Sequence, residues 1–230
     1  MKKIVILSGA GISKESGIDT FRDADGMWPK YDPRELASPE ALKNNPEKVL
    51  EFYNMRRQKM WKSDPNAAHL AILDLNKKYD VSIITQNVDD LHERAGSSNV
   101  LHLHGELNKV RSINNAEELS EVEIGKDVNL GDLSKDGSQL RPHIVLFGEP
   151  VPKMTEAIEI AKSADIFIVI GSSLQVYPAA ELIDYVPKNG IIYIVDPEIP
   201  SIYKSENMYF IKENATIGLP KLVFELLDDK

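Results

Sequence analysis

The chain contains no cysteine among its 230 residues. This absence excludes disulfide bonds, a cysteine nucleophile and any metal site that is built on thiolates. Of the five histidines, His102 and His104 have the spacing of a ligand pair on one strand face, but no third ligand stands out. Such a pair is more often one core histidine and one functional histidine, so we expect no bound metal.

Basic residues are fewer than acidic residues: the chain has 27 lysines and arginines against 36 aspartates and glutamates, and its net charge is −9. This balance argues against nonspecific binding to nucleic acid or to an anionic membrane surface. No apolar run approaches the roughly 20 residues that span a bilayer. The first apolar run, residues 4–7, is too short for a signal peptide and fits a first β-strand, so we expect a cytoplasmic protein.

Short β-branched runs alternate with longer amphipathic runs along most of the chain. The expected strands lie at 4–7, 81–85, 100–103, 166–170, 191–195 and 208–211, and the expected helices lie at 66–77, 155–163, 179–185 and 219–227. This alternation predicts an α/β fold with a doubly wound, mostly parallel sheet of the Rossmann type.

Two stretches break the alternation. Residues 21–62 hold a loop rich in glycine and proline and then a strong helix, and residues 112–139 are polar, with seven acidic residues against two lysines, a net charge of −5. The second stretch is too polar to form a core of its own, so we expect it to be mobile or tethered. We expect a small inserted lobe from about 21–65 and 112–139, and a Rossmann-like core from about 1–20, 66–111 and 140–230.

Glycine-rich turns follow two of the expected strands. Gly9-Ala10-Gly11-Ile12-Ser13 comes after the first strand, and Gly171-Ser172-Ser173 comes after strand 166–170. Glycine at such a turn lets the backbone approach a diphosphate, and Asp196, after the next strand, is placed to accept from ribose hydroxyls. Each turn alone also fits a tight strand-to-helix connection with serine capping, but two in one sheet favour a dinucleotide. The glycine spacing is not the GxGxxG of hydride-transferring dehydrogenases, which disfavours an oxidoreductase.

Polar side chains follow the strand at 81–85. Gln86, Asn87, Asp89 and Asp90 come after its end, and His104 follows the next expected strand. Burying these side chains unpaired is costly, so we expect them at the edge of the sheet where ligands of open α/β sheets bind. This cluster is the best candidate for the chemistry.

Taken together, these residues resemble the sirtuins, a family of NAD-dependent protein lysine deacylases. The matching segments stand in family order and span nearly the whole chain. They are GAGIS at 9–13, SGIDTFR at 16–22, TQNVD at 85–89, HG at 104–105, FGE at 147–149, GSSL at 171–174 and VYPAA at 176–180.

The resemblance implies a role for each motif. The loops at 9–22 and 171–173 would hold the diphosphate and the adenosine ribose of NAD, while Phe21 would shield the reactive C1′ face. His104 would be the general base, with Asn87 and Asp89 as the other catalytic residues. The implied NAD site consists of Gly9, Ala10, Gly11, Ile12, Asp19, Phe21, Arg22, Trp28, Gln86, Asn87, Val88, Asp89, Gly171, Ser172, Ser173, Asp196 and, where the family contacts adenine, Ala215. The peptide substrate would pair with a strand near Phe147, Gly148 and Glu149.

The residue types suit that chemistry. Breaking the nicotinamide–ribose bond develops oxocarbenium character, which a nearby carboxylate such as Asp89 stabilises. The acyl oxygen attacks C1′, and a base near neutral pH must then activate a ribose hydroxyl, which suits the ordinary pKa of histidine. Without the resemblance, His104 would more often be a satisfied histidine at a strand end.

The expected helix at 46–62 carries Tyr53 and Arg56 three residues apart, on one face. Tyrosine and arginine can jointly bind a carboxylate, and the pair matches the signature of class III sirtuins, which remove malonyl, succinyl or glutaryl groups. On its own, such a pair is more often an aromatic anchor beside a solvated arginine. A charged hydrogen bond contributes roughly 1.5–3 kcal/mol, or about one to two powers of ten in preference over a neutral acetyl group. We expect preference for malonyl and succinyl groups with residual deacetylase activity.

The chain departs from the family pattern at the small lobe. Most sirtuins hold this lobe with four cysteines on a structural zinc, whereas Ser112 stands where the first cysteine would be. We therefore expect no zinc, and a lobe that docks on the main domain, binds a partner or stays partly disordered. In addition, Asp90 stands where many members have glycine, and Asp196 replaces the more usual asparagine at the ribose contact.

Other functions remain open beside an NAD-dependent deacylase of acylated-lysine proteins. The same NAD site with another acceptor would give a protein ADP-ribosyltransferase or an NAD hydrolase. A noncatalytic NAD-binding module is the third possibility. The presence of His104 with Asn87 and Asp89 speaks against it, because a binding module needs no base.

Overall fold

A six-stranded sheet forms the larger part of the computed structural model, which describes residues 1–21, 26–27, 32–200 and 204–228. The strand order is β3-β2-β1-β7-β8-β9, and every neighbouring pair is parallel. The strands are β1 Lys3–Ser8, β2 Asp80–Thr85, β3 Val100–His102, β7 Ile166–Ile170, β8 Ile191–Val195 and β9 Met208–Ile211. The predicted α/β fold with a parallel sheet is confirmed.

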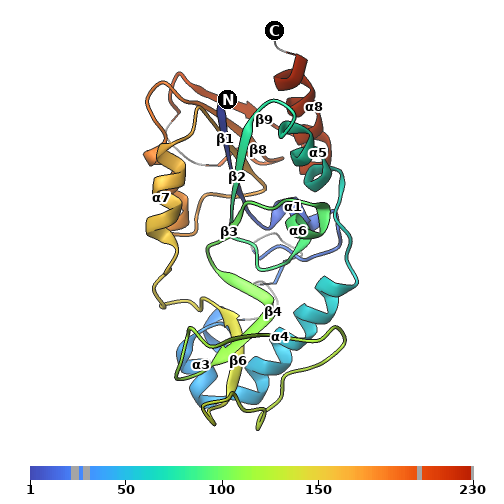
Figure 1. Ribbon diagram of the computed structural model, residues 1–230, viewed down its shortest axis with the longest axis vertical. Coiled ribbons are helices and arrows are strands. Elements are labelled where there is room, and N and C mark those ends of the chain that lie inside the picture. The colour runs from blue at the N-terminus through green and yellow to red at the C-terminus, as the bar shows by residue number, and fades with distance from the viewer. Residues whose placement is uncertain (22–25, 28–31, 201–203, 229–230) are drawn as a thin grey trace.

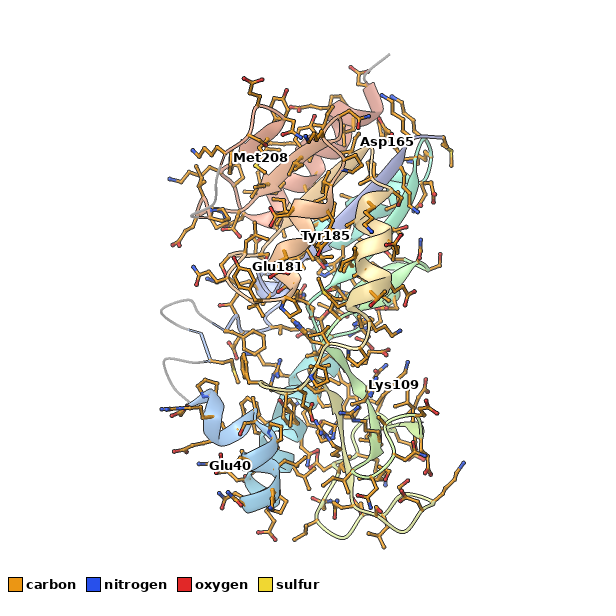
Figure 2. The ribbon with its side chains drawn as sticks, turned by 90° about the vertical axis from the view of Figure 1, so that its left-hand side faces the viewer. Glu40, Lys109, Asp165, Glu181, Tyr185 and Met208 are labelled. Carbon is orange, nitrogen blue, oxygen red and sulfur yellow. The ribbon has the colours of Figure 1, made fainter. Side chains whose placement is uncertain are left out.

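Helices cover both faces of this sheet (Figure 1). On one face lie α5 (Ala67–Leu75) and α8 (Ala215–Asp228), and on the other lie α7 (Met154–Lys162) and the 3₁₀ helix η1 (Ala179–Tyr185). Figure 2 looks onto the second face, where η1, with Glu181 and Tyr185 labelled, lies with α7 in front of the strands. None of the described helices has the length and apolarity that a bilayer-spanning helix requires.

The middle strand β1 is buried on both of its faces. Ile4 and Ile6 pack into the apolar cluster under α5 and α8, while Val5 and Leu7 pack into the cluster under α7 and η1. All four side chains have no exposed surface. This two-sided burial explains why the strand is a continuous apolar run without polar alternation.

The chain changes direction across the sheet at β1. Strands β2 and β3 continue on one side of it, and β7, β8 and β9 continue on the other. In open parallel sheets the carboxyl ends on either side of such a switch leave a crevice in which ligands bind. Short helices α1 (Gly11–Lys14) and α6 (Leu91–Ala95) follow β1 and β2 at this edge.

A second, antiparallel sheet lies at one end of the molecule (Figure 1). Its strand order is β5-β4-β6, with β4 Gly105–Ser112, β5 Leu119–Glu121 and β6 Leu140–Ile144. Beside it lie α2 (Pro33–Leu36), α3 (Pro39–Asn44) and α4 (Pro46–Trp61), and Figure 2 labels Glu40 on α3 and Lys109 on β4. These strands are not apparent from the sequence, because β4 and β6 are polar and β6 contains Pro142, a residue type that is depleted in strands.

The polar segment 112–139 is tied to α4 by one buried amide. The Asn54 side chain donates to the Val128 carbonyl oxygen over 2.9 Å and accepts from the Val128 N–H over 3.0 Å. The Val128 side chain packs with Leu50 and Val110 in a small buried cluster. The same Asn54 oxygen accepts from the guanidinium of Arg57, which is fully buried, over 2.7 Å. One side chain thus links the segment, the helix and a buried charge.

A second set of hydrogen bonds closes the segment around Ser112, at the place of the absent first cysteine. The Ser112 hydroxyl donates to Asp136 Oδ2 over 2.6 Å and accepts from the backbone N–H groups of Asn114 and Asn115. The Asn114 amide donates to the Ser138 hydroxyl over 2.7 Å. These hydrogen bonds bring the two ends of the segment together, as a structural metal site would.

We expect Asn54→Ala to destabilise the protein, because it leaves the Val128 backbone groups and Arg57 Nη1 without their buried partner, while Arg57 Nε keeps its bond to the Leu107 carbonyl oxygen. Leaving a buried polar group unpaired costs about 1–3 kcal/mol. Urea unfolding followed by circular dichroism should show a loss of at least that size. The control is Asn114→Ala, which removes a hydrogen bond of an exposed side chain. Equal stability of Asn54→Ala and the wild type would contradict the role of this amide.

Candidate active site

The two glycine turns pack directly against each other at the carboxyl edge of the sheet. The Gly11 N–H donates to the Gly171 carbonyl oxygen over 2.9 Å. Gly171 has a φ of +60°, and a Cβ at this position would lie 2.3 Å from the Ile12 nitrogen. Both the backbone conformation and the close approach therefore exclude a side chain at Gly171. The close contact between the turns requires this glycine, whatever ligand the turns bind.

Hydrogen bonds join the loop after β2 to both glycine turns. The Gln86 amide donates to Ser172 Oγ over 3.0 Å, and the Asn87 amide donates to Ser13 Oγ over 3.1 Å. Ser13 Oγ in turn donates to Asp89 Oδ2 over 3.0 Å. The structure thus brings the predicted Gln86, Asn87 and Asp89 together, and it adds Ser13. The signal for Ser13 was its place as the last residue of the GAGIS motif.

Asp89 is buried, with only 4% of its surface exposed. Burial raises the pKa of this carboxyl, while hydrogen bonds from the Leu91 N–H and from Ser13 oppose the rise. A carboxylate held in a dry site by fixed donors interacts strongly with any positive charge that forms nearby. Asp89 is therefore suited to stabilise a cationic transition state.

His104 has the tautomer and the environment of a base. Its Nδ1 lies 3.0 Å from the Gln86 carbonyl oxygen, which can only accept, so Nδ1 carries the proton and Nε2 has a free lone pair. Burial lowers the pKa of His104, partly offset by this hydrogen bond. The neutral form is therefore favoured near pH 7. The next residue, Gly105, has a φ of +83°, and a Cβ there would lie 1.9 Å from the His143 carbonyl oxygen.

His102 holds the same loop two residues before His104. Its Nδ1 lies 3.1 Å from the Asn87 carbonyl oxygen, and its Nε2 lies 2.8 Å from Glu93 Oε1. Only 8% of its surface is exposed. The spacing of His102 and His104 in the sequence is compatible with a core histidine or with half of a ligand pair. Among the described residues, no group of three or more histidine and carboxylate side chains is arranged to hold a metal ion.

A cavity beside the loop connects the first glycine turn with α4. Its wall includes Ala10, Ser13, Asp19 and Phe21 from the first turn region, Asn87, Val88 and Asp89 from the loop, and Arg56 and Lys59 from α4. Asn87 and Asp89 of the predicted nicotinamide site and the predicted acyl-binding Arg56 therefore face one space. The wall does not include Gln86, His104 or the buried Tyr53.

The Arg56 guanidinium is held by aromatic rings. Its central carbon lies 4.9 Å from the Phe21 ring centroid, 5.6 Å from that of Phe52 and 5.7 Å from that of Tyr53. Cation–π contacts of this kind orient a guanidinium without neutralising it. No carboxylate of the described residues lies within ion-pair distance of Arg56, whereas the neighbouring Lys59 is paired with Asp19 over 2.6 Å.

The structure places the other predicted residues at several positions. Ser173 is exposed after β7, Asp196 follows β8 with its Oδ1 accepting from the Glu198 N–H, and Ala215 is buried at the start of α8. The Ile12 side chain is fully buried in the sheet core, so only its backbone faces the turn. Arg22 and Trp28 lie outside the described residues.

Residues 147–149 form a turn, whereas the sequence analysis expected a strand near them. Strand β6 ends at Ile144, and Gly148 has a φ of +92°, which interrupts an extended backbone. Glu149 closes the turn by accepting from the Leu146 N–H over 2.8 Å and pairs with Arg141 over 2.6 Å. Phe147 remains 47% exposed beside this turn.

Comparisons with known proteins agree with this arrangement. The model of the Sir2 family matches residues 9–178. The chain is 54% identical over 228 residues to an NAD-dependent protein deacylase of Helicobacter pylori, and the match covers 99% of each chain. It is 46% identical to an NAD-dependent protein deacylase of Bacteroides thetaiotaomicron, over 96% of this chain and 97% of the relative.

Solved structures agree as well. A mutant of a Sir2 homologue in complex with ADP-ribose has a TM-score of 0.91 at 39% identity, over 100% of this chain and 94% of that one. A Sir2 homologue in complex with NAD has a TM-score of 0.89 at 41% identity, over 98% and 90%. A complex of Sir2 with a p53 peptide and NAD⁺ has a TM-score of 0.79 at 31% identity, over 99% and 92%.

The two histidines should titrate on opposite sides of the ordinary value of about 6.5. Burial lowers the pKa of His104, whereas the pKa of His102 is raised, because Glu93 more than offsets burial. Nitrogen-detected NMR titration, with signals assigned through His104→Gln and His102→Gln, should show His102 protonated at a pH where His104 is neutral. The reverse order would contradict these environments.

Proposed function

The chain belongs to the Sir2 family and is an NAD-dependent protein deacylase, and from this premise we propose that it prefers acyl groups that end in a carboxylate. The preferred substrates are malonyl- and succinyl-lysine, with residual activity on acetyl-lysine. The position of Arg56 in the cavity wall beside Asn87 and Asp89 is the observation that carries this proposal.

An acidic ligand would stabilise the charge of the Arg56 guanidinium. Burial lowers its pKa, which means that the charged form is poorly solvated. A poorly solvated charge without an ion-pair partner is costly, and a bound carboxylate relieves this cost. The bidentate geometry of a guanidinium fits the terminal carboxylate of a malonyl or succinyl group.

Tyr53 is the second residue that we propose for this ligand, on the ground of its place beside Arg56 on α4. Burial raises the pKa of its hydroxyl to about 12, so the phenol stays protonated at physiological pH and remains a donor. A donor hydroxyl and a guanidinium from one helix face can hold the two oxygens of a carboxylate. A neutral acetyl group offers no acceptor that matches this pair.

The residues of the loop after β2 suit the two chemical steps of the family reaction. The cavity combines the apolar Ala10, Phe21 and Val88 with the amide of Asn87, which fits a nicotinamide ring and its carboxamide. Asp89 faces the positive charge that develops as the nicotinamide–ribose bond breaks and the acyl oxygen attacks C1′. His104 then takes a proton from a ribose hydroxyl through Nε2. One water molecule is consumed as the amine is released, and the products are nicotinamide, free lysine and O-acyl-ADP-ribose.

We further propose that the small lobe works without zinc. The hydrogen bonds of Ser112 to Asp136 and of Asn54 to Val128 supply the connections that a zinc site supplies elsewhere in the family. A structural zinc contributes roughly 10–16 kcal/mol of apparent binding energy, so a lobe that needed it would not survive chelation.

The acyl preference is tested with three matched peptides that carry acetyl-, malonyl- or succinyl-lysine. We expect Tyr53→Phe/Arg56→Met to lower the succinyl-to-acetyl ratio of kcat/KM by about one to two powers of ten, because a charged hydrogen bond is lost. The control is Lys62→Met, which removes an exposed cation at the end of the same helix. An unchanged ratio in the double variant would refute the preference.

Mass spectrometry of the products separates the reaction classes in the same assay. O-acyl-ADP-ribose marks a deacylase, whereas ADP-ribosylated protein or free ADP-ribose would mark the same NAD site serving another acceptor. NAD consumption that persisted unchanged in His104→Ala would contradict the assignment of His104 as the base.

Removal of metal should leave the enzyme intact. After dialysis against a zinc chelator we expect unchanged deacylation and an unchanged melting temperature, and added zinc should restore nothing because nothing was lost. Loss of either property on chelation, with recovery on addition of zinc, would contradict the proposal.

A further inference from the structure

Two histidines near the end of β3 hold consecutive carbonyl groups of the loop after β2. The His104 ring contacts the Gln86 oxygen, and the His102 ring contacts the Asn87 oxygen. His104 keeps a free ring nitrogen for chemistry, whereas both nitrogens of His102 are used. The second histidine therefore has a task other than proton transfer to substrate.

The contacts of His102 determine its charge. Its Nδ1 must donate, because the Asn87 carbonyl oxygen can only accept. Its Nε2 lies 2.8 Å from the Glu93 carboxylate, and a bare nitrogen at this distance would repel it. With Glu93 ionised, as its lowered pKa indicates, this geometry places a proton on both nitrogens and makes His102 an imidazolium paired with Glu93.

We propose that His102 is a positioning residue for NAD cleavage: paired with Glu93 as an imidazolium, it holds the Asn87 carbonyl and with it the loop that carries Asn87 and Asp89. This inference rests on the proposed assignment of Asn87 and Asp89 to the nicotinamide pocket. It does not depend on the preference for acidic acyl groups.

The charged groups around His102 favour this role. Glu93 faces it from α6, Glu106 faces it from β4, and Asp89 faces it from the loop. Burial alone would lower the pKa of His102, but the Glu93 hydrogen bond and the charges of Glu93 and Glu106 raise it. On the same helix His92 stays neutral because burial holds its pKa well below the ordinary value. Lys109 of β4 lies near Glu93 and favours its ionised form.

The same charges link Asp89 to His102. Burial raises the pKa of Asp89, and the positive charge of His102 lowers it again. If His102 loses its proton at alkaline pH, Asp89 stays ionised, but Nε2 no longer donates to Glu93 and the ring that holds the Asn87 carbonyl loses its second contact. The direction of the pH dependence follows from the raised pKa of His102. The ion pair of His102 and Glu93 is complete below about pH 6.5, and it is lost as the pH rises through the pKa of His102 in the folded protein.

Exchange of labelled nicotinamide into NAD, in the presence of an acylated peptide, tests this inference. Exchange reports formation and reversal of the cleavage step, which precedes the proton transfer to His104. The variant is Glu93→Gln, a near-isosteric change at an exposed carboxylate that leaves a hydrogen-bonding partner for His102. The control is Glu159→Gln on α7, which breaks an exposed pair with Lys162.

We expect the exchange rate of the wild type to fall on the alkaline side, as His102 deprotonates. In Glu93→Gln this fall should move to lower pH, and exchange at neutral pH should drop about tenfold, the effect of one charged hydrogen bond. Lowering the pH should restore the rate, because protonation returns the charge. Glu159→Gln should keep the wild-type profile.

A companion variant separates the two contacts of His102. His102→Asn keeps a donor near the Asn87 carbonyl but removes the charge, so its exchange should be slow at every pH and show no alkaline fall. The melting temperature of each variant, measured at the assay pH, separates slow exchange from unfolding. A wild-type rate and profile in Glu93→Gln would overturn the inference.

The failure of the proposed acyl preference looks different. It would give equal exchange with acetyl and succinyl peptides while the shift caused by Glu93→Gln remained. If Glu93→Gln left the pH profile of exchange unshifted while the succinyl preference was intact, only the proposed role of His102 would be refuted.

Discussion

The parallel pairing of β1 between β2 and β7 is the constraint on which the site depends. It brings three strand ends, far apart in the sequence, to one edge of the sheet. The contact between Gly11 and Gly171, and the hydrogen bonds of Gln86 and Asn87, then join the three following turns. Gln86, Asn87 and Asp89 each have a hydrogen-bond partner from another strand end. The site is therefore a product of the sheet topology more than of any one loop.

Burial of charge is the second feature that organises the site. Asp89, Arg56 and His102 carry charge in places with little water, where an interaction is stronger than at a surface. Each is balanced differently: Asp89 by fixed donors, Arg56 by aromatic rings, and His102 by Glu93. Of the three, Arg56 is the cation without an ion-pair partner among the described residues, and for this reason we propose it as the partner of a substrate carboxylate.

Hydrogen bonds hold the small lobe together where apolar packing is limited. Its polar segment contributes few apolar side chains, with Val128 as its buried member beside Leu50. The Asn54 amide and the Ser112 hydroxyl connect this segment at its middle and at its ends. Several hydrogen bonds of modest strength, one of them to the Asp136 carboxylate, can close the segment together, because each forms on a backbone that the others already hold in place.

The sequence by itself determined the parallel sheet and the residues that gather at its edge. The apolar runs of β1 and β7 are continuous because both faces are covered, and polar side chains that end such strands have no other place to lie. Tertiary structure alone decided the antiparallel strands of the lobe, the turn at Gly148 and the partners of Ser13. It also decided the different tasks of His102 and His104. The sequence shows two histidines two residues apart, but it does not show which groups each ring contacts. The reason is that pairing across the fold sets a ring's hydrogen bonds, burial and charge, whereas local sequence sets only its position.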